Sequence, residues 1–327
     1  MGLLQLREEI SKYLKERFNI NRFSTNDIII TIGASEAIDL TLRAVMDDGD
    51  EILIPDPSYV SYAPCVYLAG GKSVAVPCKK ENNFAITPED LESVITPKTK
   101  ALIFPYPNNP TGGIMEKEKL EALIPIILKH DLLVITDEIY AELTYGENHV
   151  SLASYKELEN RVVLISGFSK AFAMTGWRIG YVCANGELKD AILKIHQYSA
   201  ICAPIFSQHA AYSALIEGRL DNFSTVVDMR DEYDRRRKFM YKTFLDMGFD
   251  CFEPKGAFYI FPSVESLNMT GDEFAERLLK EEKVAVVPGS AFGDSGKYHI
   301  RCSYAYSMQE LIRATDKIKK FVQSLKK

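Results

Sequence analysis

The sequence predicts an α/β protein with a mostly parallel sheet of seven strands, followed by a smaller α+β domain. Short apolar runs alternate with helix-length stretches as far as residue 183, which is typical of crossover units between parallel strands. The 327 residues are enough for two domains, and a hydrophobic fraction of 46% supports a full core. We expect a large domain at 1–230 and a small C-terminal domain at 231–327.

The strand candidates are short apolar runs bounded by polar or turn residues. They lie at 28–32, 52–54, 73–76, 101–104, 132–136, 162–166 and 179–183. An amphipathic helix precedes them, with one apolar face formed by Leu3, Leu6, Ile10, Leu14 and Phe18.

A long charged helix leads out of this region. It is predicted from about 222 to 247, with apolar residues at Val226, Met229, Tyr233, Phe239 and Phe244. Short strands at 257–261 and 284–287, with helices near 271–282 and 308–325, then predict the small α+β domain.

The first strand passes through Gly33 into a helix that begins with Ala34 and Ser35. The free N–H groups of such a helix start can hold a phosphate, although a lone strand, glycine and helix is a weak signal. Further along, the strand 101–104 is followed by a sharp turn, Pro107–Gly112, which contains Asn109. Open α/β sheets bind ligands at this edge, but any tight turn could have the same composition.

The strand 132–136 ends on a carboxylate, Asp137, with the phenol of Tyr140 three residues later. The two side chains share one side if the chain turns helical. The alternative is that Asp137 only caps the next helix.

Lys170 follows the apolar run 162–165 and precedes a segment rich in Gly, Ser and Thr. A lysine amine becomes nucleophilic when it is partly desolvated or lies near positive charge, and Arg178 is eight residues away. Most lysines are simply solvated, so Lys170 alone would not indicate a reactive amine. Together, however, these motifs provide an amine for an aldehyde, a carboxylate for a pyridinium nitrogen, cations and N–H groups for a phosphate, and a phenol and an amide for a ring hydroxyl. These groups are the ones that pyridoxal 5′-phosphate (PLP) requires.

The chain resembles the class I/II PLP-dependent aminotransferases of fold type I, in the branch of bacterial and archaeal aspartate and aromatic aminotransferases. The motifs that carry the resemblance are Gly33–Ser35, Pro55–Tyr59, Asn108–Gly112, Asp137–Tyr140, Ser169–Lys170 and Gly176–Gly180. The resemblance implies the PLP-transferase fold, with helices on both faces of the seven-stranded sheet.

The resemblance also implies catalytic roles. Lys170 corresponds to the lysine that forms the internal aldimine and then shuttles the substrate proton. Asp137 corresponds to the carboxylate that keeps the pyridine nitrogen protonated. Tyr140 and Asn109 match the pair that hydrogen-bonds the ring hydroxyl.

Further binding roles follow from the same resemblance. Tyr59 matches the aromatic residue that stacks on the cofactor ring. The phosphate contacts would be Ala34, Ser35, Ser169 and Arg178. Arg301 matches the arginine that binds the substrate α-carboxylate, which Asn109 also touches.

The resemblance therefore implies transfer of an amino group from an L-amino acid to a 2-oxo acid, with 2-oxoglutarate as the expected acceptor. Two alternatives share the fold: a PLP-dependent C–S lyase or decarboxylase, and a catalytically impaired aminotransferase-like binding module. The family's N-terminal arm, which covers the active site, is not found before Met1, so we expect an effect on activity. The sequence does not predict which amino acid is the donor, because pocket contacts set that choice.

Charge and cysteine usage restrict the partners. A formal net charge of −6 gives no footprint for nucleic acid, and the basic run 235–238 follows three carboxylates, as on a solvated helix face. The six cysteines and five histidines show no metal-ligand spacing, and reduced thiols suit a cytoplasmic protein. No apolar run is long enough to cross a bilayer. The resemblance implies a homodimer whose active site lies at the subunit interface.

Overall fold

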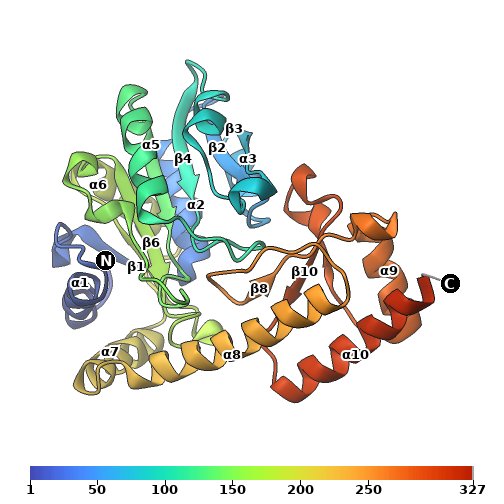
Figure 1. The fold of residues 1–327 in the computed structure, drawn as a ribbon. Helices are drawn as coiled ribbons and strands as arrows, with labels where there is room; N and C mark the ends of the chain where they lie inside the picture. Colours follow the sequence, from blue (N-terminus) through green and yellow to red (C-terminus); the bar gives the residue numbers. More distant parts are fainter. Residues whose placement is uncertain (326–327) are drawn as a thin grey trace.

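The large sheet has seven strands within residues 1–325, the part of the chain that the computed structural model describes. Their spatial order is β1-β7-β6-β5-β4-β2-β3 (Figure 1). The strands are β1 (Ile28–Thr31), β2 (Glu51–Asp56), β3 (Lys72–Pro77), β4 (Thr99–Phe104), β5 (Leu133–Asp137), β6 (Val162–Gly167) and β7 (Gly180–Cys183). All pairs among β2 to β6 are parallel, whereas β7 runs antiparallel to both β1 and β6. The predicted mostly parallel sheet is therefore confirmed.

Helices cover both faces of this sheet, as predicted. The helices of this region are α1 (Leu4–Phe18), α2 (Gly33–Val45), α3 (Tyr62–Leu68), α4 (Pro88–Glu92), α5 (Lys117–Lys129), α6 (Gly186–Ser199) and α7 (Ile205–Leu220). Leu102 and Leu164 face a core shared with α1, α5 and α7, whereas Ile103 and Ile165 face a core shared with α2, α3 and α6. This alternation follows from the period of two along a strand.

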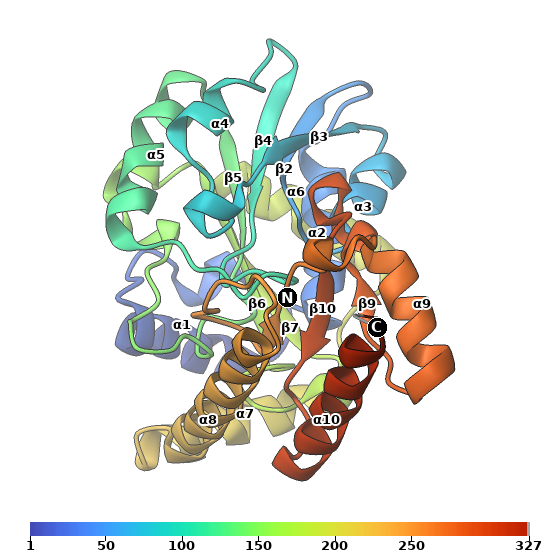
Figure 2. The ribbon, with the colours of Figure 1, turned by 45° about the vertical axis from the view of Figure 1, so that its right-hand side comes forward.

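A smaller antiparallel sheet lies beside the loops that follow the parallel strands (Figure 2). Its order is β8 (Tyr259–Ile260), β10 (Ile300–Ser303) and β9 (Val287–Pro288). The helices α8 (Ser224–Asp246), α9 (Gly271–Glu282) and α10 (Met308–Leu325) pack on it through an apolar core that includes Phe244, Phe274 and Phe321. The sequence patterns predicted these helices and β8, but the strand predicted at 284–287 shares only Val287 with β9. They missed β10, because its four residues contain the charged Arg301 and no apolar run.

The parallel strands β2, β4, β5 and β6 end at one edge of the large sheet. The loops after them carry Tyr59, Asn109 and Lys170, and Asp137 is the last residue of β5. The topology therefore brings residues that are far apart in the sequence to one site.

Candidate active site

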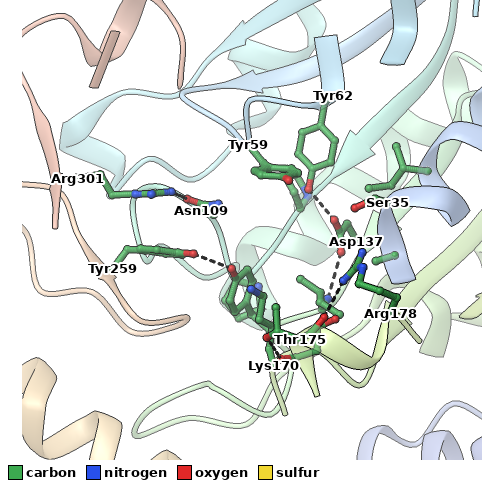
Figure 3. A pocket seen from close by; sticks show the side chains of 17 residues that line it. Ser35, Tyr59, Tyr62, Asn109, Asp137, Lys170, Thr175, Arg178, Tyr259 and Arg301 are labelled. Atoms are coloured by element: carbon green, nitrogen blue, oxygen red, sulfur yellow. Dashed lines mark hydrogen bonds between the residues drawn. The ribbon is translucent and has the colours of Figure 1, made fainter. Parts of the chain in front are cut away.

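One cavity of about 310 Å³ lies at this edge, and all ten sequence-predicted site residues line it (Figure 3). They are Ala34, Ser35, Tyr59, Asn109, Asp137, Tyr140, Ser169, Lys170, Arg178 and Arg301. The large sheet, its loops and the start of α2 contribute nine of them, and β10 of the small sheet contributes Arg301. The cavity is thus closed by both parts of the chain.

Asp137 is a buried carboxylate, 6% exposed. The Tyr62 hydroxyl donates to Oδ2 at 2.8 Å, and the Ile139 backbone N–H donates to Oδ1 at 3.2 Å. Burial raises the pKa of Asp137 to about 6 despite these two donors. A cation placed in the cavity against this carboxylate would therefore relieve an unfavourable buried charge.

Lys170 lies in the loop after β6, half-buried, with its Nζ 5.6 Å from the centre of the Tyr140 ring and 5.4 Å from that of Phe258. Burial lowers the pKa of the Lys170 amine, and the nearby Arg178 guanidinium lowers it further. Both effects increase the neutral, nucleophilic fraction of the amine.

An anion cup forms where α2 begins, and we define it as Ala34, Ser35, Ser169, Thr175 and Arg178. No side chain caps the start of α2, so its first N–H groups are free to bind an anion. Ser35 and Arg178 lie on the same side of the cavity in Figure 3. Thr175 was not predicted; its hydroxyl donates to the Ser169 carbonyl at 2.8 Å, and its own carbonyl accepts from Arg178 Nη1 at 3.0 Å.

Two glycines make the cup possible. Gly33 has a φ of +73°, and a Cβ there would lie 2.6 Å from Arg178 Nη2. A Cβ on Gly180 would lie 2.6 Å from the Ala34 backbone nitrogen. Only glycine allows α2 and Arg178 to approach this closely.

Arg301 closes the other end of the cavity. Its Nη1 donates to Asn109 Oδ1 at 2.9 Å, and its guanidinium lies between the rings of Tyr259 and Phe292, with centroids at 4.6 and 4.7 Å. Its Nε is buried without a hydrogen-bond partner among the described residues. A planar guanidinium held between two rings, with donors to spare, suits a carboxylate.

Besides Thr175, the sequence analysis missed three aromatic residues at the site: Tyr62, Tyr259 and Phe292. The Tyr259 hydroxyl lies 2.9 Å from that of Tyr140, and the Tyr59 ring packs edge-on against Tyr62 at 5.5 Å. The spacing of Tyr59 and Tyr62, three residues apart at the start of α3, could have indicated that both face the same site. Nothing in the local sequence marks Tyr259 or Phe292.

The fold and the cavity together define a PLP-dependent enzyme of fold type I. An amine, a buried carboxylate and an anion cup line one cavity, and these are the groups that bind the aldehyde, ring nitrogen and phosphate of PLP. Residues 1–318 match the family model for aminotransferase class I and II, and the chain belongs to that family. It is an aminotransferase that uses PLP and acts on amino acids and 2-oxo acids, as the resemblance had implied.

Several known proteins are similar over nearly the whole chain. The putative aminotransferase YugH of Bacillus subtilis is 47% identical over 98% of this chain and 82% of its own length. An aspartate aminotransferase of Pyrococcus abyssi is 44% identical over the full chain and 84% of its own length. The crystal structure of the aromatic aminotransferase from Pyrococcus horikoshii superimposes with a TM-score of 0.96 at 42% identity, covering 99% of this chain and 86% of that one. Because relatives this similar differ in the amino acid that they are named for, similarity alone does not identify the donor.

Within residues 1–325, no helix is long and apolar enough to cross a membrane. The same residues contain no group of His, Cys, Asp or Glu side chains placed to hold a metal ion.

Proposed function

We propose that this aminotransferase moves the amino group of an L-amino acid to 2-oxoglutarate, with each cavity residue in the role implied by the resemblance. Bound PLP supplies an aldehyde and an electron-withdrawing ring that stabilises negative charge on the substrate α-carbon. The observation that supports the proposal most strongly is the placement of Lys170 and Asp137 on one cavity, with Arg178 at one end and Arg301 at the other.

Each residue then has a defined role. With PLP bound, Lys170 Nζ would hold the cofactor covalently and would move the proton at the substrate α-carbon. Asp137 would keep a proton on the ring nitrogen, and Tyr140 and Asn109 would hydrogen-bond the ring hydroxyl. Tyr59 would pack on the ring face. Arg301 and Asn109 orient the substrate through its α-carboxylate.

The test is an absorption spectrum of the purified protein with PLP, recorded before and after addition of single amino acids. A transaminase converts the cofactor to its amine form with particular donors, and 2-oxoglutarate restores the spectrum. Release of pyruvate and ammonia would instead identify a lyase, and release of carbon dioxide a decarboxylase. A cofactor spectrum that no amino acid changes would identify a binding module.

Arg301→Lys tests the carboxylate site. Lysine keeps the charge but loses the planar pair of donors, so we expect kcat/KM to fall by about 10- to 100-fold for both the amino acid and the 2-oxo acid. Most of this loss should lie in KM, because the lost contact exists before and during the reaction. Steady-state kinetics with each substrate measures the effect. Arg313→Lys, at an exposed arginine on α10, is the control.

We also propose a homodimer. Large apolar side chains are exposed around the start of α7, next to Arg178: Trp177, Tyr198, Ile201, Ile205 and Phe206. The Ser207 hydroxyl donates to the Trp177 carbonyl at 2.7 Å, which ties α7 to the cup loop. An exposed apolar cluster of this kind beside an active site is typical of a subunit interface.

Light scattering should give twice the chain mass, and Phe206→Asp should lower it. Leu279→Asp, at an equally apolar but separate exposed position on α9, is the control and should leave the mass unchanged. A monomeric wild-type protein with full activity would exclude the dimer as a requirement.

Two lesser proposals concern organisation and location. The division into domains near residue 230 falls within α8, and it is supported by Val226, which packs in the large core, and by Phe244, which packs in the small one. A cytoplasmic location is supported by the six cysteines, all of which are unpaired thiols. Limited proteolysis and cell fractionation test them.

A further inference from the structure

The buried His196 pairs with the partly buried Glu36, the residue that follows Ser35 of the anion cup. His196 Nδ1 lies 2.8 Å from Glu36 Oε1, and the side chains are 0% and 14% exposed. His196 comes from α6, which packs against α2, and Glu36 is the residue after Ser35. An ionised carboxylate accepts hydrogen bonds and cannot donate them, so the imidazole Nδ1 carries the hydrogen in this pair.

The Glu36 carboxylate is held away from the cavity on both of its oxygens. Oε1 accepts from His196, and Oε2 accepts from the backbone N–H of Ile32, the residue before α2. The cavity is lined by Ala34 and Ser35 on one side of Glu36 and by Ile38 beyond it, but not by Glu36 itself. The pair therefore fixes a negative charge one residue away from the donors of the cup.

This arrangement has an electrostatic consequence. A phosphate with nearly two negative charges in the cup would be repelled by a carboxylate free to turn toward it, because like charges a few ångströms apart repel each other. The pair is also maintained although His196 Nε2 is buried and has no hydrogen-bond partner in the described part of the chain. A buried ring nitrogen without a partner is unfavourable, so helix packing alone does not explain a histidine at this position.

We propose that His196 is a positioning residue that keeps the Glu36 carboxylate out of the anion cup and so sets the affinity for the cofactor phosphate. This inference rests on the proposed phosphate contacts of Ala34, Ser35 and Arg178. The pair contributes to binding of the phosphate group and not to binding of the ring or aldehyde.

The test compares PLP with pyridoxal, which lacks the phosphate, as ligands of the full chain stripped of cofactor. Quenching of the single tryptophan, Trp177, which precedes Arg178, reports binding of both. His196→Leu removes the donor, and we expect the affinity for PLP to fall about tenfold while the affinity for pyridoxal is unchanged. His196→Asn, nearly the same shape as leucine, keeps a donor close to the position of Nδ1 and should retain most of the PLP affinity.

A second change separates charge from packing. Adding Glu36→Gln to His196→Leu removes the negative charge that would otherwise turn toward the cup. The affinity for PLP should therefore recover even though the histidine is still absent. Glu36→Gln alone should not weaken PLP binding, which keeps the proposal testable if His196→Leu does not fold. The control is His130→Leu, which breaks a similar pair, Nε2 to Glu92 Oε1 at 2.9 Å, far from the cup.

Three outcomes would overturn the proposal: equal losses for PLP and pyridoxal in His196→Leu, no loss at all, or no recovery in the double variant. Arg178→Ala separately tests the cup itself. If Arg178→Ala has the same ratio of PLP affinity to pyridoxal affinity as the wild type, the phosphate does not bind in the cup. The phosphate contacts assigned under the proposed function would then be wrong.

Discussion

Replacing Lys170 by alanine should lower kcat by on the order of 10²- to 10⁴-fold, the range expected when a positioned proton-transfer group is removed. The chain has no second amine on the cavity among the described residues, so nothing replaces the lost group. The visible absorption of the covalently held cofactor should disappear as well, because its aldehyde has no amine partner.

Lys170→Arg tests whether charge or proton transfer matters. Arginine keeps the positive charge but stays protonated under all ordinary conditions, so we expect it to be as inactive as alanine. Turnover and absorption spectra measure both variants, with Lys189→Ala, a lysine on α6 outside the cavity, as control. Appreciable turnover in either Lys170 variant would mean that another group moves the substrate proton.

The sequence was sufficient for the large sheet because the central parallel strands β2, β4, β5 and β6 are largely buried on both faces and therefore contain apolar runs. It was also sufficient to predict that Asp137 and Lys170 line one site, since Asp137 ends such a strand and Lys170 lies in the loop after another. Prediction failed where a residue's environment comes from a distant part of the chain. β10 is defined by pairing with β8 and β9, and Tyr259 reaches the site only because the small sheet packs against the large one.

The same reasoning explains why the pair Glu36 and His196 could not be found in the sequence. The two residues are 160 positions apart, and each has an ordinary local context in its own helix. Only the packing of α6 on α2 brings them together. Side-chain pairs between crossover helices have no sequence pattern comparable to the periodicity of a strand.

Asp137→Asn should lower kcat by on the order of 10²- to 10³-fold with little change in KM, the loss typical when one preorganised electrostatic group is removed from an active site. Asparagine fills the same space and can still accept from Tyr62, but it has no charge to keep a proton on the ring nitrogen. Kinetics at saturating donor measure the effect. Asp90→Asn is a matched control, because Asp90 is also 6% exposed but pairs with Lys79 outside the cavity.

The same substitution should stabilise the protein without cofactor, in a way that depends on pH. Burial raises the pKa of Asp137 to about 6, above the value of about 3.9 in an unfolded chain, so between these values the folded state binds more protons. Stability from this group is fully present below pH 4 and is lost as pH rises through 6. The total is about 3 kcal/mol.

Asparagine does not titrate, so the apoprotein of Asp137→Asn should exceed the wild type in unfolding free energy by up to about 3 kcal/mol at pH 7.5 and should match it more closely near pH 4. Denaturant unfolding of both apoproteins at the two pH values measures this difference. A difference that does not change with pH would mean that Asp137 is not buried as a charged group at neutral pH. A gain in stability together with a loss of kcat would show that the carboxylate is retained for catalysis at the expense of the fold.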